Sequence, residues 1–584
     1  MIDAPANLLT VWARLVAASL VSTGVRDVVV SPGSRSTPFV LALRERAELR
    51  LTSVIDERSA AFVALGMARS SGRAAAVLAT SGTAPAHWLP AVIEASLAHL
   101  PLVLLSANRP VALAQTGAAQ TIDQTKLFGS YVRFFADLGD PGPDEAALSG
   151  LARTIGQAVA IANGHPSGPV HLDLHADKPL EPVEPRSVEE LALTARARAV
   201  AARGVTQVSG GSTGADDAFA TVLAAALGRA RRPLVLAGPR RTSGDEALLL
   251  EACAGARLPV APEATSQLRF AGVRSLALEA TELTFSSARF ATEHAPDCLL
   301  QIGALPTAPT LERAWSHVPR FVLDAGGVHD PIGGALAISL GPATATLLTA
   351  LERARPQTDE AWLSSLLRGE SCAWAEVERA LASPRTEGAI VRSALGAAPR
   401  ATLVIGNSLP IRTLDRFVPG GGARRVVLCQ RGANGIDGLV SGAVGAAIAG
   451  DETVLAVVGD VSFLHDLNAL ATARTLARAL VVVIVDNGGG RIFEGLPIAR
   501  DPALEGAMAL FTTPHGVDLA AASRAFGVAC TETETARDTA RAVANAITRP
   551  QVTIVRARVA DGDAARTFPA LIAAFERAFY GAPT

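Results

Sequence analysis

The sequence has 584 residues, of which 49% are hydrophobic and 18% charged, and its formal net charge is -2. This length predicts about three or four domains, and the balanced charge gives no reason to expect nucleic acid or an anionic membrane as a partner. The five cysteines form no Cys-x-x-Cys pair, which disfavours a zinc or dithiol site and indicates a reducing, cytoplasmic location. The apolar stretch from Leu8 to Val21 is interrupted by Arg14, so we expect an amphipathic helix there and neither a signal peptide nor a membrane span.

Strand-like and helix-like segments alternate along the chain in three blocks. The first block, residues 1–184, has strand-like runs at residues 25–30, 75–79, 102–106 and 170–174. A segment rich in proline and glutamate, followed by weak apolar periodicity, predicts a linker over residues 185–214. The second block, residues 215–355, has such runs at residues 233–238, 298–303 and 320–324.

The third block, residues 356–584, has the densest set of strand-like runs. They lie at residues 401–405, 426–429, 454–458, 480–485 and 552–555. Strands that alternate with helices predict parallel sheets. The expected fold class is therefore α/β, with three doubly wound parallel-sheet domains.

The first candidate site follows the first predicted strand, where the chain reads Ser31-Pro32-Gly33-Ser34-Arg35-Ser36-Thr37-Pro38. Free N–H groups at a helix start favour an anion, and an arginine such as Arg35 can grip a carboxylate through two hydrogen bonds. A serine-capped helix with a surface arginine is the ordinary alternative, and it is favoured when this segment is considered alone.

A glutamate, Glu57, opens an apolar helix-like stretch that runs to Ala68. An acid in the first turn of a helix commonly complements the helix dipole. A catalytic role for Glu57 therefore needs a second observation elsewhere in the chain.

The second observation is a pair of segments in the third block. Gly459-Asp460 follows one strand-like run, and Asp486-Asn487-Gly488-Gly489-Gly490 follows the next. The carboxyl ends of parallel strands line the ligand crevice, hard divalent cations take oxygen ligands that they share with phosphates, and a glycine lets the backbone approach closely. We predict a magnesium–diphosphate anchor at Asp460, Asn487 and Gly489, against the alternative of an ordinary turn or helix cap.

This pair of segments resembles the cofactor signature of thiamine diphosphate enzymes, in which Gly-Asp-Gly precedes Asn-Asn. The resemblance implies thiamine diphosphate and Mg²⁺ (or Mn²⁺) as cofactors, with the Asp460 and Asn487 side chains and the Gly489 carbonyl as metal ligands. It also implies that Glu57 hydrogen-bonds the aminopyrimidine and promotes loss of the thiamine C2 proton, a role suited to a desolvated carboxyl with a raised pKa. By this resemblance, residues 1–184 are the pyrimidine-binding domain, residues 215–355 the central domain and residues 356–584 the diphosphate-binding domain.

Further segments resemble one branch of this family, the synthases of menaquinone biosynthesis that decarboxylate 2-oxoglutarate and add the resulting carbanion to isochorismate. The matching segments are residues 31–38, 80–84, 106–110, 406–412, 430–438, 491–493 and 513–516. Both substrates carry several carboxylates, so several arginines are expected. Loops after predicted strands supply Arg35, Arg109, Arg412 and Arg431.

The resemblance implies roles for individual residues. Glu57 and Gln120 are the expected catalytic residues, and Ile436 is expected to bend the thiamine, with core packing as its ordinary alternative. Further cofactor contacts are expected from Thr83, Gly459, Ser462, Ile492 and Phe493. The expected substrate-binding residues are Ser34, Arg35, Arg109, Gln120, Ser408, Arg412, Arg431, Ile492, Phe493 and Leu496. A homodimer or homotetramer is implied, with Glu57 from one chain and Asp460 from its partner.

The sequence departs from the family pattern at several positions. Val461 replaces a glycine, Asp486 replaces an asparagine, and Ala119 stands where an asparagine usually precedes the glutamine. The stretch from residue 303 to 310 lacks the usual lysine. Losing a charged hydrogen-bond partner costs about 1.5–3 kcal/mol, so we expect weaker isochorismate binding unless Arg313 or another cation compensates.

Two other functions remain open from the sequence. One is a different thiamine enzyme, such as a 2-oxoacid decarboxylase or an acetohydroxyacid synthase, although the paired histidines common in the decarboxylases are absent from the sequence. The other is a degenerate, non-catalytic homologue that serves as a binding or regulatory subunit. Asp486, Ala119 and the missing lysine favour it, whereas Glu57 and the intact metal-ligand set oppose it.

Overall fold

The computed structural model describes residues 6–185, 187–205, 214–273, 276–308, 315–331, 333–560 and 562–581. The chain forms two compact units. The first unit comprises Met1–Gly211, Gln430–Asp451 and His465–Ala477, and the second comprises Ser212–Cys429, Glu452–Leu464 and Arg478–Thr584.

The first unit is built on a six-stranded sheet in the order β2-β1-β3-β4-β6-β5, and each neighbouring pair is parallel. Its strands are β1 Asp27–Val30, β2 Arg50–Ser53, β3 Ala75–Ala79, β4 Leu102–Asn108, β5 Phe134–Asp137 and β6 Val170–His175. The central strands β1, β3, β4 and β6 are buried along their whole length, which is expected of a parallel sheet covered on both faces.

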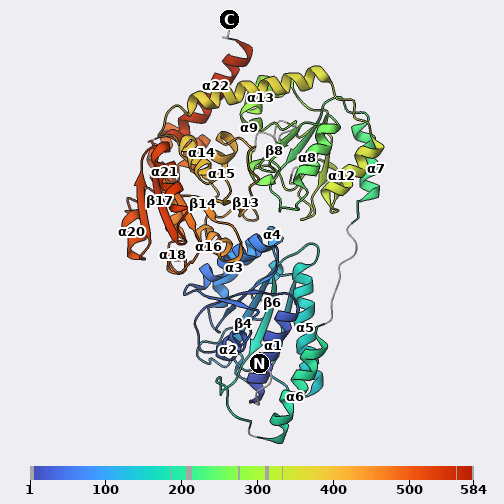
Figure 1. Cartoon of the computed structure of the whole chain (residues 1–584), viewed down its shortest axis with the longest axis vertical. Coiled ribbons are helices and arrows are strands. Elements are labelled where there is room, and N and C mark those ends of the chain that lie inside the picture. The colour runs from blue at the N-terminus through green and yellow to red at the C-terminus, as the bar shows by residue number, and fades with distance from the viewer. Residues whose placement is uncertain are drawn as a thin grey trace. The chain divides into compact units, whose positions relative to one another are not determined.

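Helices cover the sheet of the first unit, and three of them, α2, α3 and α16, begin at or just after predicted site residues. They are α1 Leu8–Ser22, α2 Thr37–Arg44, α3 Glu57–Ser71, α4 Leu89–Leu97, α5 Glu145–Asn163, α6 Val188–Arg203, α16 Leu439–Ala449 and α18 Ala469–Ala473. Helices α1, α5 and α6 pack against one another (Figure 1). Helix α6 falls inside the predicted linker, where its Leu193, Ala197 and Val200 are buried in the core.

Helices α3 and α16 pack closely because glycines line their contact. A Cβ on Gly66 would lie 2.1 Å from the carbonyl oxygen of Gly442, and a Cβ on Gly445 would lie 2.0 Å from that of Val63. A separation below 3.0 Å is not tolerated by real side chains. These contacts hold the middle of α3 against α16, the helix that follows the segment carrying Ile436.

The second unit contains two sheets, both parallel throughout their described ladders. One has the order β11-β10-β9-β7-β8 and the other β13-β12-β14-β15-β17-β16. The first comprises β7 Pro233–Ala237, β8 Val260–Pro262, β9 Cys298–Ile302, β10 Arg320–Leu323 and β11 Ala335–Ser339. The second comprises β12 Thr402–Ile405, β13 Val427–Cys429, β14 Val454–Gly459, β15 Leu480–Asp486, β16 Ala529–Thr533 and β17 Val552–Arg558.

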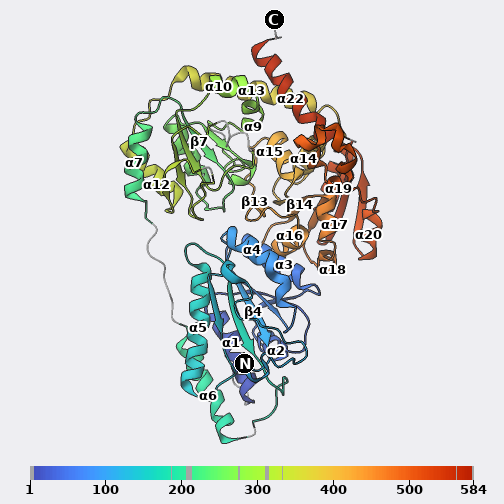
Figure 2. The ribbon, with the colours of Figure 1, turned by 180° about the vertical axis from the view of Figure 1, so that it is seen from behind.

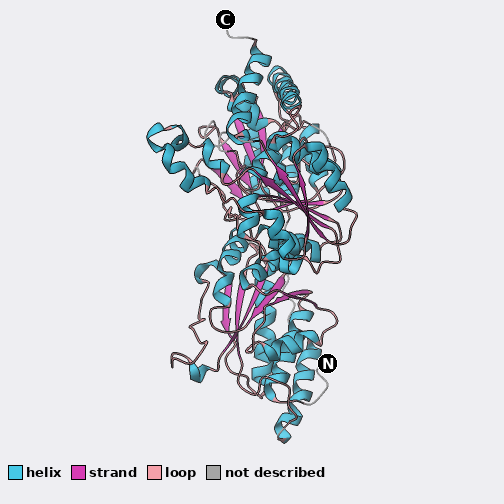
Figure 3. Ribbon diagram, turned by 90° about the vertical axis from the view of Figure 1, so that its left-hand side faces the viewer, coloured by secondary structure: helices cyan, strands magenta, loops and turns pink. Residues whose placement is uncertain are grey.

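Helices cover these sheets as well, and α7 and α12 pack together beside β7 (Figure 2). The helices are α7 Asp217–Leu227, α8 Glu246–Gly255, α9 Thr281–Ser286, α10 Ala288–Glu293, α12 Ala343–Arg353, α13 Glu360–Ala380, α14 Glu387–Ala397, α15 Leu409–Phe417, α17 Asp460–His465, α19 Met508–Thr512, α20 Leu519–Ala525, α21 Ala536–Ala546 and α22 Asp563–Tyr580. Strands between layers of helices are visible throughout (Figure 3).

The predicted fold class is confirmed: the chain is α/β with three parallel sheets. Each predicted strand is present, and the structure adds β2, β5, β8, β11 and β16. The domain boundaries at residues 184, 214 and 355 stay a prediction, except that α6 gives residues 188–203 a regular structure that the predicted linker did not include. Within the described ranges, we find no helix whose length and apolarity would let it cross a membrane.

Candidate active site

Asp460 lies at the carboxyl end of β14 and is the first residue of α17. Its side chain is buried, and its Oδ2 accepts a hydrogen bond from the Gly489 backbone N–H at 2.7 Å. The His515 Nε2 lies 3.3 Å from the same oxygen. Strands β14 and β15 are neighbours with Gly459 opposite Val485, so the segments that follow them meet at one edge of the sheet. The expected proximity of Asp460 and Gly489 is therefore present.

Asn487 follows β15 and is oriented by a glutamate that is 100 residues away in the sequence. Its Nδ2 donates to the Glu387 Oε1 at 2.7 Å. This contact leaves the Asn487 Oδ1 as a buried acceptor without a hydrogen-bond partner among the described residues. Because a buried acceptor is costly to leave unpaired, this oxygen marks a position for a ligand such as a cation.

Gly489 has a backbone conformation that only glycine adopts readily, with φ of +135°. A Cβ at this position would lie 2.2 Å from the carbonyl oxygen of Thr512. The neighbouring Gly490 N–H donates to that same carbonyl at 2.6 Å. The glycine therefore allows the loop to lie tightly between Asp460 and the end of α19, and the close backbone approach expected at Gly489 is present.

These residues fit a divalent cation. Carboxylate, amide and backbone carbonyl oxygens are the ligands that Mg²⁺ takes in phosphate-binding sites, and no group in the described part of the chain satisfies the Asn487 oxygen. Burial, and then the nearby Asp486 carboxylate, raise the pKa of Asp460. Burial also raises the pKa of Glu387 to about 7. A bound cation would reverse this unfavourable accumulation of negative charge.

The unusual Asp486 is neutralised by a partner that the sequence did not indicate. Arg556 Nε, on the adjacent strand β17, donates to the Asp486 Oδ2 at 2.7 Å, and both side chains are buried. The Gly488 N–H adds a hydrogen bond at 3.2 Å. The negative charge that the family pattern lacks is therefore balanced within the second unit.

We expect Arg556→Met to lower the free energy of unfolding by about 3–5 kcal/mol, because it leaves the buried Asp486 carboxylate unpaired. The matched control is Arg558→Met, whose more exposed guanidinium pairs with Glu532 and is expected to contribute at most about 1 kcal/mol. Urea unfolding measures both variants. Adding Asp486→Asn to Arg556→Met should recover part of the loss, and equal losses in the two single variants would contradict the pairing.

In the first unit, Glu57 is the first residue of α3 and is partly exposed. The cap before it is fixed, since Asp56 accepts hydrogen bonds from the Arg58 and Ser59 N–H groups and from the Asn468 side chain. The Glu57 carboxylate has no hydrogen-bond partner among the described residues. The helix start is thus held in place while this carboxylate stays available.

The other predicted residues of the first block lie at the carboxyl ends of the same sheet. Arg35 is buried, and its Nη1 donates to the Ala176 carbonyl at 2.6 Å. Arg109 donates to the Ala119 carbonyl at 2.9 Å, so Ala119 contributes through its backbone. Gln120 has φ of +55° and donates to the Ser81 carbonyl at 3.1 Å. The residues Ser34 and Thr83 are exposed.

The loop of residues 430–438, which carries Arg431 and Ile436, is held by Glu94. The Glu94 carboxylate accepts hydrogen bonds from the Gly432 and Ala433 N–H groups at 3.1 and 2.6 Å and pairs with Arg69 at 2.8 Å. A cavity of about 190 Å³ beside this loop is lined by Phe62, Pro90, Ile93, Glu94, Gln430, Ala433, Gly435 and Asp437. Ile436, between the lining residues Gly435 and Asp437, is half-buried, and its role in bending the thiamine stays a prediction beside the alternative of core packing.

The remaining predicted residues lie in the second unit. Ser408 caps α15 with φ of +70°, and its carbonyl accepts a hydrogen bond from Arg412 at 2.7 Å. Strained backbone of this kind is typical of ligand sites. Ser462 is buried on α17, Ile492 and Phe493 are partly buried, and Leu496 is 43% exposed. Arg313, the suggested substitute for the missing lysine, lies outside the described residues.

The structure thus brings Asp460, Asn487 and Gly489 together, and it adds three residues to which the sequence analysis gave no role. His515 lies within a segment that matched the family, which was a usable signal. Glu387 and Arg556 had no local signal, because they reach the site only through packing of α14 and pairing of β17.

Comparison with known proteins identifies the family. Residues 11–127 match the protein-family model for the N-terminal TPP binding domain of thiamine pyrophosphate enzymes. Residues 422–557 match the family model for the C-terminal TPP binding domain. A 2-succinyl-5-enolpyruvyl-6-hydroxy-3-cyclohexene-1-carboxylate (SEPHCHC) synthase from Sorangium cellulosum is 42% identical over 96% of this chain and 94% of its own length. The chain belongs to the SEPHCHC synthase family.

Other SEPHCHC synthases are similar to this chain over nearly the same share of its length. The synthase of Myxococcus xanthus is 40% identical over 91% of both chains, and that of Halobacterium salinarum is 39% identical over 91% of this chain and 92% of its own. Membership in the SEPHCHC synthase family makes the protein a thiamine diphosphate-dependent enzyme of the transferase class. The resemblance stated from the sequence is thereby confirmed.

Proposed function

We propose that this protein decarboxylates 2-oxoglutarate and adds the resulting carbanion to isochorismate by conjugate addition, a step of menaquinone biosynthesis. The observation that carries the proposal is the set of oxygens at the ends of β14 and β15, where the Asn487 Oδ1 is buried without a hydrogen-bond partner among the described residues and Asp460 contacts the backbone of Gly489. The similarity to SEPHCHC synthases over most of the chain supports the choice of substrates.

In this proposal, Asp460, the Asn487 side chain and the Gly489 carbonyl hold Mg²⁺ (or Mn²⁺) on the diphosphate, with Gly459 and Ser462 beside it. Bound thiamine diphosphate supplies a nucleophilic carbon and an electron sink for the decarboxylation. The Glu57 carboxylate holds a proton at the aminopyrimidine, and Ile436 and Thr83 shape the thiamine pocket. Ile492 and Phe493 give an apolar wall that keeps water from the reacting carbon.

The arginines orient the two acids. Arg412 and Arg431, with Ser408, are proposed to bind the carboxylates of 2-oxoglutarate, since guanidinium groups bind carboxylates through paired hydrogen bonds. Arg35 and Arg109, with Ser34, are proposed to face isochorismate. Gln120 donates a hydrogen bond to the reacting groups, and Leu496 adds apolar contact.

The assembly and location follow the same proposal. The protein acts as a homodimer or homotetramer in the cytoplasm, with Glu57 of one chain and Asp460 of its partner at each site. Such isologous pairing is the commonest symmetry of soluble oligomers. No nucleic acid takes part.

A coupled assay tests the function. Protein with thiamine diphosphate and Mg²⁺ should release carbon dioxide from 2-oxoglutarate and consume isochorismate in equal amounts. Pyruvate, which lacks the distal carboxylate, is the comparison substrate, and its kcat/KM should be lower by at least about 100-fold because the arginines are left unpaired. Preferential turnover of pyruvate would identify a different thiamine enzyme, and cofactor binding without turnover of either acid would indicate a non-catalytic homologue.

A further inference from the structure

The first unit contains a second group of cation-binding side chains that shares no residue with the candidate active site. It lies where β4, β6 and β5 end. Asp137 on β5 is directly opposite Asp173 on β6, and His175 is two residues further along β6. Residues paired in this way share one face of the sheet, as do alternate residues of one strand. Two ionised carboxylates directly opposite each other repel, and a cation between them relieves this repulsion.

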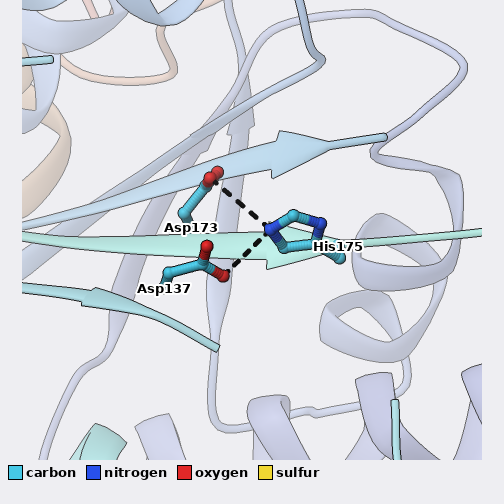
Figure 4. A group of neighbouring side chains, drawn as sticks. All are labelled: Asp137, Asp173 and His175. Carbon is cyan, nitrogen blue, oxygen red and sulfur yellow. Dashed lines mark ion pairs between the residues drawn. The ribbon is translucent and has the colours of Figure 1, made fainter. Parts of the chain in front are cut away.

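The distances within this group suit a shared ion (Figure 4). The His175 Nε2 lies 2.9 Å from the Asp137 Oδ1 and 3.8 Å from the Asp173 Oδ2. One ligand atom from each residue falls within 4.8 Å of the others. Ligands of a tetrahedral zinc ion, each about 2.0–2.1 Å from the metal, lie about 3.3 Å apart, which is between the two measured separations.

The histidine supplies an independent indication of a ligand. His175 is only 5% exposed, and neither of its ring nitrogens makes a hydrogen bond with any residue that the structure describes. The Asp137 oxygen is close to Nε2 but does not have hydrogen-bond geometry with it. A buried imidazole without hydrogen bonds is costly, whereas two ligands of one metal ion lie close together without bonding to each other.

Neighbouring side chains hold the Asp173 carboxylate by hydrogen bonds, as the residues around a metal ligand do. Ser106 Oγ donates to the Asp173 Oδ1 at 2.8 Å, and Asn108 Nδ2 donates to its Oδ2 at 2.7 Å. The Asp140 Oδ1 lies 3.8 Å from the other ring nitrogen of His175. At that distance Asp140 makes no hydrogen bond with the ring, whereas hydrogen bonds to a ligating carboxylate, like those to Asp173, are a regular feature of metal centres. Asp137 is 43% exposed, which leaves a path for an ion from solvent.

We propose that Asp137, Asp173 and His175 bind a divalent transition-metal ion, with zinc as the best match. One imidazole and two carboxylates suit zinc better than calcium or magnesium, which prefer oxygen ligands alone. The ion joins the edge strand β5 to β6 and so stabilises this edge of the sheet.

The test uses full-length protein with Asp460→Asn, which silences the candidate cofactor metal site, after removal of metals by a chelator. Calorimetric titration with zinc should show one site per chain. Adding Asp137→Asn or His175→Gln should weaken zinc binding by more than about 100-fold. Mutation of a residue that only hydrogen-bonds a metal ligand already lowers metal affinity 10–100-fold, and these variants remove a ligand itself. The matched control is Asp177→Asn, an exposed carboxylate two residues beyond His175, which should bind zinc normally.

Cobalt gives a second readout, since Co²⁺ in place of zinc should show visible absorption that Asp137→Asn removes. Asp137 is partly exposed, so this variant decides the outcome if His175→Gln fails to fold. Zinc affinity unchanged by Asp137→Asn, or absent from the Asp460→Asn protein, would show that the group is only a histidine–aspartate ion pair and would overturn the proposal. Neither result bears on turnover of 2-oxoglutarate.

Discussion

Asp460→Asn should weaken binding of thiamine diphosphate with Mg²⁺ by more than about 100-fold and reduce turnover at least as much. The carboxylate is the only charged member of the proposed ligand set. Mutation of residues that merely hydrogen-bond a metal ligand already lowers metal affinity 10–100-fold. Calorimetric titration with Mg²⁺ and the cofactor measures the affinity directly, without reliance on activity.

The fold should survive this change. Burial raises the pKa of Asp460, so its charge is unfavourable in the metal-free protein, and a neutral asparagine should leave the melting temperature unchanged or higher. The matched control is Asp451→Asn, which changes an exposed carboxylate before the opposite end of β14. Normal affinity for the cofactor in Asp460→Asn, whatever its melting temperature, would refute the proposed role of Asp460 in holding the metal and the diphosphate.

Glu57→Gln should bind the cofactor nearly as well as the wild type and lose at least about 100-fold in kcat. The amide keeps the shape of the side chain but cannot exchange a proton at the aminopyrimidine, and general acid–base groups typically contribute 10²–10⁴-fold. Steady-state kinetics with 2-oxoglutarate and isochorismate measure the loss. Glu48→Gln, an exposed glutamate that pairs with Arg46, is the matched control, and near-normal turnover in Glu57→Gln would exclude the role.

Mixing the two inactive variants tests whether a site draws on two chains. If Glu57 and Asp460 come from different chains, a mixed dimer of Glu57→Gln and Asp460→Asn contains one fully wild-type site. Random mixing should then restore about a quarter of the wild-type activity. If both residues of a site come from one chain, no mixed dimer has an intact site, and the mixture should stay inactive.

Much of the fold could be predicted from the sequence, because the central strands are short apolar runs buried on both faces. The strands that were missed, β2, β5, β8, β11 and β16, lie at the edges of their sheets. Apart from β8, which has three residues, these strands are partly exposed and carry polar residues. An edge strand pairs with only one neighbouring strand and is only partly covered by helices. It therefore contains more polar residues, and its apolar run in the sequence is weaker.

Helix α6 was missed for a related reason. Its residues are mostly alanine, arginine and glutamate, and only four of its side chains, Leu193, Thr194, Ala197 and Val200, are buried. The narrow apolar stripe gives little periodicity in the sequence. Packing against α1 and α5 makes the helix stable, and that packing is visible only in the tertiary structure.

The sequence by itself determined the family and the three parallel sheets, and it predicted the ligand set of Asp460, Asn487 and Gly489, since each depends on local runs and on glycines that follow strands. Only the tertiary structure decided that Glu387 orients Asn487, that Arg556 neutralises Asp486, and that Asp137 meets His175. The partners in the first two pairs are 100 and 70 residues apart. The physical reason is that strand order and register bring them together, and neither is encoded in local periodicity.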